Sequence, residues 1–365
     1  MLCTVCILLA LFFSLTTSAQ SAVSPSPSSG ERRVQTEPVH VFLVGDVMLG
    51  DQAQKTLNEQ GYDYPFRNLR PLFADADLVV GNLEAPLTRL SEVLDPKKEY
   101  SYKADPRCAP ALHELGFTMF TLANNHSLDY RMAGLKDTLK NLDEQGILYF
   151  GAGRSEAEAT AGTIVERGGI RLGFLGFMAP YGPYASKYDY FAHGESGGIA
   201  RMDEATMRAA VARLRPEVDV LIASMHWGEN YEPVSQEQRE LGKLAAGLGF
   251  DLVFGHHPHV AQGVELIGGI PILYSLGNFT FCTKGRFSKL DARWRHGWIA
   301  DVLIDAGHVR QVDLIPIDVD NEVVKFQPRR SDPAELPGLV EFLNAGFGTP
   351  LRVVDDRVRL ELPRN

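Results

Sequence analysis

The stretch DLVFGHHPHV, residues 251–260, joins a short apolar run to three histidines around a proline. The chain has 10 histidines in 365 residues, so three within four positions is a strong local concentration. An apolar run between an aspartate and a glycine is typical of a strand buried on both faces. Pro258 fixes its own φ and favours an extended His257, which would hold His257 and His259 in defined directions. The stretch predicts a strand whose end delivers two metal-ligating imidazoles, with His256 supporting the site or contacting substrate.

The same strand pattern recurs through the body of the chain. Comparable apolar runs occupy residues 39–45, 77–81, 117–123, 171–178, 219–225, 251–255 and 271–277. Leucines at helical spacing predict helices within 132–146 and 236–249, each of which stops at a glycine. Alternating strands and helices indicate an α/β fold.

After residue 285 the pattern changes. The runs 297–305 and 308–317 flank Ala306-Gly307, which predicts a β-hairpin. The tail holds one predicted helix within 333–346 and one predicted strand at 357–362. We expect one domain over residues 38–325 and a small C-terminal appendage over residues 326–365.

The N-terminal segment predicts export. Residues 1–19 read as a signal peptide, because the apolar run 5–15 is short for a membrane span and small residues follow it. No Lys or Arg precedes the run, and an uncleaved anchor is the alternative. Residues 20–37 form a Ser/Pro-rich linker. We expect an extracytoplasmic protein, either released or associated with the membrane.

Composition limits the partners and the redox chemistry. The formal net charge of −10 argues against a nucleic-acid partner, because phosphate binding needs clustered Lys and Arg. Cys3 and Cys6 lie in the expected signal. The remaining pair, Cys108 and Cys282, is compatible with one disulfide or with two buried free thiols.

Polar residues follow six of the predicted strands. They are Asp46, Asn82, Glu84, Asn124, Asn125, His126, His226, His256, His257, His259 and Asn278. Each alone is better explained as a turn residue or a hydrogen-bonded histidine. Because the carboxyl ends of strands in an α/β sheet line one crevice, the recurrence over six strands favours a common site.

Imidazole, carboxylate and amide groups make a mixed nitrogen and oxygen site, which suits divalent Mn, Zn or Fe. Two such ions about 3.5–4 Å apart form a common hydrolytic arrangement. Asn125 is then expected to be a ligand, and His126 beside it the general acid for the leaving group or a stabiliser of charge. We expect one or two ions, with His256 and Asn278 at the substrate.

In order along the chain, six motifs resemble those of the CapA family of poly-γ-glutamate capsule biosynthesis proteins. They are GDVMLG (45–50), GNLEAPLT (81–88), ANNHSLDY (123–130), MHWGENY (225–231), GHHPHVAQGVE (255–265) and YSLGNF (274–279). The resemblance covers about residues 38–285. It implies a four-layer α/β/β/α sandwich similar to calcineurin-like metallophosphatases, and an exported protein linked to capsule polymer.

The resemblance also implies site residues. Carried over motif by motif, the metal ligands are Asp46, Asn82, Glu84, Asn125, His226, His257 and His259, beside the catalytic His126. Two positions depart from metallophosphatases proper. Met48 stands where their first motif has a histidine, and Asn82 or Glu84 stands where they carry a bridging aspartate. Glu84 would restore the bridge, and a single-metal or vestigial site is the alternative.

Two functions remain after the sequence is read. The first is an exported, metal-dependent hydrolase of the phosphoesterase type, acting in capsule polymer synthesis on an anionic polymer or a phosphoester. The second is a non-catalytic component that binds or exports the polymer alongside subunits of a membrane synthase. A plain extracellular binding module ranks last, because it does not explain the polar strand ends.

Overall fold

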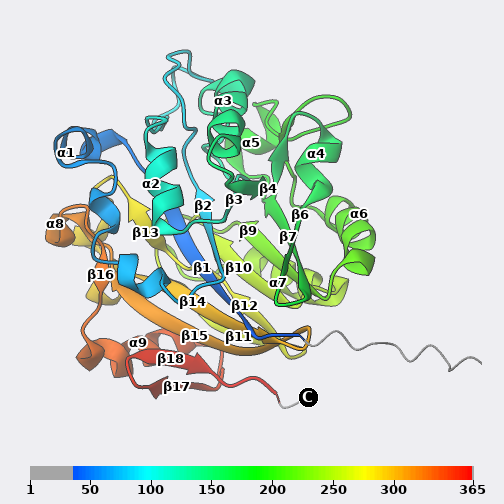
Figure 1. Ribbon diagram of the computed structural model, residues 1–365, viewed down its shortest axis with the longest axis vertical. Helices are drawn as coiled ribbons and strands as arrows, with labels where there is room; N and C mark the ends of the chain where they lie inside the picture. The colour runs from blue at the N-terminus through cyan, green and yellow to red at the C-terminus, as the bar shows by residue number, and fades with distance from the viewer. Residues whose placement is uncertain (1–35, 364–365) are drawn as a thin grey trace, which may run out of the picture. The chain divides into compact units, whose positions relative to one another are not determined.

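The computed structural model describes residues 36–363, apart from the side chains of residues 288 and 293. The expected signal peptide and most of the linker lie outside these residues. Among residues 36–363, no helix is both long enough and apolar enough to cross a membrane. This part of the chain is one compact unit (Figure 1).

Two large sheets make up its centre. The first runs in the order β17 (Leu351–Val354), β18 (Arg357–Leu360), β15 (His308–Asp318), β14 (His296–Asp305), β1 (Val39–Met48), β2 (Leu78–Leu83), β3 (Met119–Thr121) and β4 (Leu148–Phe150), with β13 (Asn278–Phe281) beside β1 and β16 (Arg329–Arg330) beside β15. The second runs in the order β11 (Val264–Ile267), β12 (Ile270–Leu273), β10 (Leu252–His256), β9 (Val220–His226), β7 (Ile170–Met178) and β6 (Thr163–Arg167). A short pair, β5 (Ala152–Gly153) and β8 (Gly198–Ile199), stands apart.

Three apolar cores separate four layers. Side chains alternate along a strand, so β1 sends Val41 and Leu43 into the core between the sheets and Phe42 and Val44 into the core on its other face. Helices α1 (Gln54–Gln60), α2 (Cys108–Leu115) and α3 (Arg131–Asp143) cover the first sheet. Helices α4 (Glu156–Ala161), α6 (Glu204–Leu214) and α7 (Gln236–Leu248) cover the second. The predicted four-layer α/β/β/α sandwich is therefore confirmed (Figure 1).

The predicted strands and hairpin are present. All seven apolar runs contain a strand, and strands β14 and β15 pair in antiparallel register across the turn. Ala306 and Gly307 both have positive φ, 48° and 73°, as a two-residue turn between twisted strands requires. The short strands β4, β6, β11 and β13 were not expected, because runs of three to five residues are too short to be distinguished from loops by their pattern.

The C-terminal segment is built onto the sandwich. Helix α9 (Leu336–Asn344) places three leucines in the core shared by the two sheets, and strands β17 and β18 extend the first sheet beyond β15. Arg359 binds Asp313 through two hydrogen bonds of 2.7 Å each. The short helices α5 (Gly182–Ser186) and α8 (Asn321–Val324) lie in connections between strands.

Both cysteines of the body are buried free thiols. Burial raises the pKa of Cys282 to about 12 and that of Cys108 well above its usual range. Of the two alternatives that the sequence left open, the structure has the free thiols.

Candidate metal centre

The carboxyl ends of strands from both sheets meet at one place. Asp46 on β1 is in register with Asn82 on the parallel strand β2 and with Asn278 on β13. In the second sheet His226 on β9 is in register with His256 on β10. The strand ends that the sequence analysis singled out therefore converge, as expected for an α/β crevice.

Two glycines let the backbones approach each other just before the site. A Cβ atom on Gly45 would lie 1.9 Å from the carbonyl oxygen of Gly277, and one on Gly255 would lie 2.0 Å from that of Tyr274. Asp46 and His256 follow these glycines directly. The close backbone packing at these glycines therefore fixes the positions from which the side chains of Asp46 and His256 extend.

The Asp46 carboxylate is fully buried and bound on both oxygens. Oδ1 lies 3.1 Å from Nδ1 of His256 and accepts a hydrogen bond of 2.9 Å from Nδ2 of Asn82. Oδ2 lies 3.1 Å from Nδ1 of His259. Burial alone would raise the pKa of Asp46, but the two histidines hold it well below the usual range. Asp46 is therefore an anion within the site.

Glu84 is in the opposite state. It is also fully buried, and Asn82 donates a hydrogen bond of 3.1 Å to its Oε2. Its Oε1 has no hydrogen-bond partner among residues 36–363 and lies 3.8 Å from Nε2 of His259. Burial, followed by the charge of Asp46, raises the pKa of Glu84 well above its usual range. A buried carboxyl group with an unpaired oxygen is suited to binding a cation.

Glu84 is shared by two groups of potential metal ligands. One ligand atom each from Asp46, Glu84 and His259 lie within 4.8 Å of one another. The same holds for Glu84, His226 and His257. Two ligand triads that share a carboxylate match a two-ion centre with Glu84 as the bridge, the role that the sequence left open between Asn82 and Glu84.

His226 and His257 are kept neutral, as metal binding requires. Burial and then the neighbouring His257 lower the pKa of His226 well below its usual range. Burial and then His259 lower the pKa of His257 to about 3. Nε2 of His226 lies 2.8 Å from Oδ1 of Asn125, while its Nδ1 finds no partner among the described residues.

The backbone at His257 and His259 differs from our prediction. Pro258 was expected to hold His257 extended, but His257 has a φ of 96° and His259 a φ of 59°. The prediction was wrong because the chain turns sharply at the end of β10 to aim both rings at the site. Such left-handed conformations are strained for residues with a Cβ, and they concentrate at functional sites.

His126 stands beside the two triads and belongs to neither. Its Nδ1 lies 2.7 Å from Oδ2 of Asp129, a buried carboxylate that also accepts from the backbone N–H of Tyr102 and pairs with Lys98. Burial lowers the pKa of His126, although Asp129 opposes this. The imidazole is therefore neutral at pH 7 with its Nδ1 proton held by Asp129, and Nε2 remains for proton exchange.

A model of the family described as "Bacterial capsule synthesis protein PGA_cap" matches residues 40–283. The chain belongs to the PGA_cap family. The CapA resemblance inferred from the motifs is confirmed, and the match contains all the site residues named above.

Curated relatives agree with this membership. The chain is 31% identical to the PGA biosynthesis protein CapA of Bacillus subtilis (strain 168), over 66% of this chain and 62% of that protein. It is 33% identical to the capsule biosynthesis protein CapA of Bacillus anthracis, over 68% of this chain and 61% of that protein. A probable polyglutamine synthesis accessory protein of Mycobacterium tuberculosis (strain CDC 1551 / Oshkosh) is 32% identical over 76% of this chain and 74% of its own length. The chain thus spans about three fifths of the length of the two Bacillus relatives.

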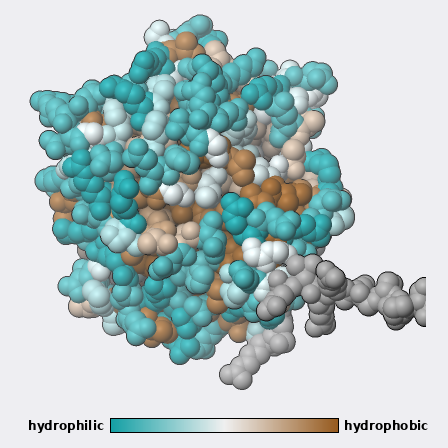
Figure 2. Space-filling view, viewed as in Figure 1, coloured by the Kyte–Doolittle hydropathy of each residue, from teal (hydrophilic) through white to brown (hydrophobic). Residues whose placement is uncertain are grey.

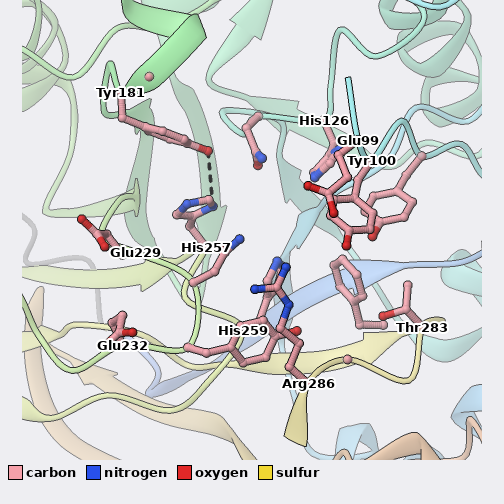
Figure 3. Close-up of a pocket in the computed structure, with 18 of the residues that line it drawn as sticks. Glu99, Tyr100, His126, Tyr181, Glu229, Glu232, His257, His259, Thr283 and Arg286 are labelled. Carbon is pink, nitrogen blue, oxygen red and sulfur yellow. Dashed lines mark hydrogen bonds between the residues drawn. The ribbon is translucent and has the colours of Figure 1, made fainter. Parts of the chain in front are cut away.

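The PGA_cap site opens into a cleft of about 800 Å³ (Figure 3). Asn125, His126, His257 and His259 are among the residues that line it. The charged residues that line it are Asp51, Glu99, Glu229, Glu232, Glu237, Lys98, Lys284 and Arg286. Acids exceed bases, which suits divalent cations and repels an anion until cations are bound. Over the face drawn in Figure 2, hydrophilic residues predominate and apolar ones gather in small groups.

Two residues expected at the substrate lie elsewhere. His256 is fully buried, does not line the cleft, and its Nδ1 faces Asp46. Asn278 also stays beneath the surface, with its Oδ1 3.1 Å from Nδ1 of His259. Both side chains face expected ligands instead of the cleft, His256 at the end of β10 and Asn278 at the start of β13. The structure thus places His256 in a supporting position, the other role that the sequence analysis gave it.

Sequence reasoning missed Asp129, Lys98 and the tyrosines after β7. Asp129 had a usable signal, since it lies three residues after His126 in the same motif. Lys98 had none, because it comes from the long connection between β2 and α2 and reaches Asp129 only in the folded chain. Met48, the departure noted in the first motif, packs into the core beneath the helices and offers the site no ligand.

Proposed function

We propose that the protein is an exported accessory protein of capsule or poly-γ-glutamate synthesis whose PGA_cap site is a two-ion hydrolytic centre of the phosphoesterase type. The observation that carries the proposal is Glu84, a fully buried carboxyl with a free oxygen that belongs to both ligand triads. The donor set of imidazoles, carboxylates and an amide suits Mn, Zn or Fe. The names of the relatives support the link to capsule polymer.

The residues divide the chemical work. Asp46, Glu84, Asn125, His226, His257 and His259 would hold the ions. His256 and Asn278 would fix the ligands through hydrogen bonds. Asn82, expected as a ligand, would do the same, because its amide donates to Asp46 and Glu84. When bound, the ions would polarise a phosphoryl or acyl oxygen and make water a stronger nucleophile. His126 would exchange a proton with the substrate at Nε2, while Asp129 holds Nδ1 and fixes the ring.

The His126→Ala variant tests this assignment. The protein should keep its metal content and melting temperature, because His126 belongs to neither triad. Metal-dependent hydrolysis of a model phosphodiester should fall about 10²–10⁴-fold, the usual contribution of a general acid or base. Elemental analysis, thermal unfolding and the assay on the same preparations decide the outcome. Loss of metal together with activity would make His126 a ligand instead.

Metal binding should release a proton. Because its pKa is raised, the Glu84 carboxyl of the metal-free protein keeps its proton at pH values above the usual range for a glutamate. A carboxylate that bridges two ions must lose that proton. Asp46 is already ionised and contributes none. Titration calorimetry in two buffers of different ionisation enthalpy should give different apparent enthalpies. The difference should shrink as the pH rises through the folded-state pKa of Glu84, and equal enthalpies throughout would contradict a protonated Glu84.

The same linkage predicts how the metal-free protein responds to acid. Folding lowers the pKa of His257 from about 6.5 in the unfolded chain to about 3. The resulting contribution to the free energy of unfolding is fully present above about pH 6.5 and is lost as the pH falls toward about 3. Glu84 acts with the opposite sign, since its raised pKa stabilises the fold at low pH and that contribution fades as the pH rises.

A second function rests on Met48. Because this position supplies no ligand, the first triad has fewer donors than an Asp-x-His motif would give. A weaker centre that binds polymer carboxylates without cleaving a bond is the alternative, as part of a membrane synthase or export assembly. Saturable, metal-dependent polymer binding without turnover would support it, and release of shortened polymer would exclude it.

A further inference from the structure

The connection that follows β7 supplies the site with tyrosines. Tyr181 and Tyr184 both line the cleft, and Figure 3 shows the phenol of Tyr181 pointing toward His257, with His126 farther across the cleft. The phenol oxygen of Tyr181 lies 3.5 Å from Nδ1 of His257, and the two ring centroids are 4.9 Å apart. This is the strand end at which the sequence showed no Asp, Asn, Glu or His.

The bonding capacity of imidazole fixes the direction of this hydrogen bond. With Nδ1 facing Tyr181, Nε2 of His257 is the nitrogen left for a metal ion. A neutral imidazole bound to metal through Nε2 carries its proton on Nδ1, so Nδ1 must donate. The phenol oxygen of Tyr181 then accepts from His257, and its own proton has to point elsewhere. Because Tyr181 lines the cleft, as His257 and His259 do, the open direction leads into the cleft.

We propose that Tyr181 is a substrate-contacting residue of the metal-loaded protein, donating its phenol proton to an oxygen of the bound phosphoryl or acyl group while it orients His257. Metal at His257 makes Nδ1 the donor of this hydrogen bond, which leaves the phenol proton of Tyr181 for the substrate. The inference rests on the proposed function, because it requires metal at His257. A neutral donor aimed at an oxygen that gains charge is a common means of stabilising a transition state.

The test uses full-length protein loaded with Mn²⁺ and inorganic phosphate as the probe. Tyr181→Phe keeps the ring and removes only the hydroxyl. We expect unchanged Mn²⁺ stoichiometry and melting temperature, with phosphate bound about 10- to 100-fold more weakly, the usual range for a lost hydrogen bond to a charged group. The matched control is Tyr188→Phe, because Tyr188 donates to Asp95 and does not line the cleft. This control should bind phosphate like the wild type.

The outcomes separate this inference from the proposed function. A wild-type protein that binds neither Mn²⁺ nor phosphate overturns the proposed function, and the role of Tyr181 with it. Mn²⁺ and phosphate binding that are both unaffected by Tyr181→Phe overturn the role of Tyr181 alone. Loss of Mn²⁺ in the variant would also overturn it, because Tyr181 would then serve only to hold His257.

Discussion

Glu84→Gln is expected to abolish binding of both metal ions while leaving the metal-free protein as stable as the wild type. Glu84 is common to both triads, so one substitution removes a ligand from each. Burial and the charge of Asp46 raise the pKa of Glu84, and below that pKa the metal-free protein carries the neutral acid, which glutamine imitates in shape and charge. At a hundredfold excess of metal over its dissociation constant, the wild type should gain about 2.7 kcal/mol of stability, and the variant none.

Thermal unfolding with and without Mn²⁺, together with elemental analysis, measures this effect. Hydrolytic activity should fall to the level of metal-free protein. Glu265→Gln is a suitable control, because Glu265 is a partly buried carboxylate that binds the hydroxyl of Tyr274 and does not line the cleft. A Glu84→Gln protein that still binds two ions would rule out Glu84 as the bridge.

The second large effect concerns His257 and His259, on either side of Pro258. His257→Ala should empty the triad that also contains His226, and His259→Ala the triad that also contains Asp46. Each single variant should therefore bind about one ion instead of two, and the double variant none. Both should lose metal-dependent activity, because a two-ion reaction needs both sites.

His256→Ala should behave differently from its neighbours. Its Nδ1 supports Asp46 and it belongs to neither triad. We expect two ions at saturation with an affinity lowered about 10- to 100-fold, the usual cost of losing a residue that orients a ligand. Metal titrations of the three single variants distinguish these outcomes. If His256→Ala lost an ion at saturating metal and His257→Ala lost none, the assignment of ligands would be one residue out of register.

Much of the fold was predictable because its signals are local. An apolar run such as 251–255 indicates a buried strand from five residues, and the Ala306-Gly307 turn predicts its hairpin without reference to the rest of the chain. Periodic leucines likewise predicted α3 and α7. The short strands β4 and β13 were missed, because pairing with neighbours already in place forms them.

The site was predictable as a set of residues but not as an arrangement. Strand ends in an α/β sheet converge for topological reasons, so Asp46, Glu84 and His226 could be named together before any coordinates. The φ of His257 could not be foreseen, because the preference of a residue before proline is weaker than the tertiary contacts that aim its ring.

The sequence by itself determined the seven buried strands, the hairpin, helices α3 and α7, the family, and the identities of the polar residues at the strand ends. Only the tertiary structure decided what each residue does there. It gave Glu84 a free oxygen between two triads, placed His256 behind Asp46, and brought Lys98 and Tyr181 to the cleft from distant connections. The physical reason is that secondary structure follows from neighbours along the chain, whereas ligation and pKa depend on distances of a few ångströms and on burial. Those distances and that burial exist only after the two sheets have packed together.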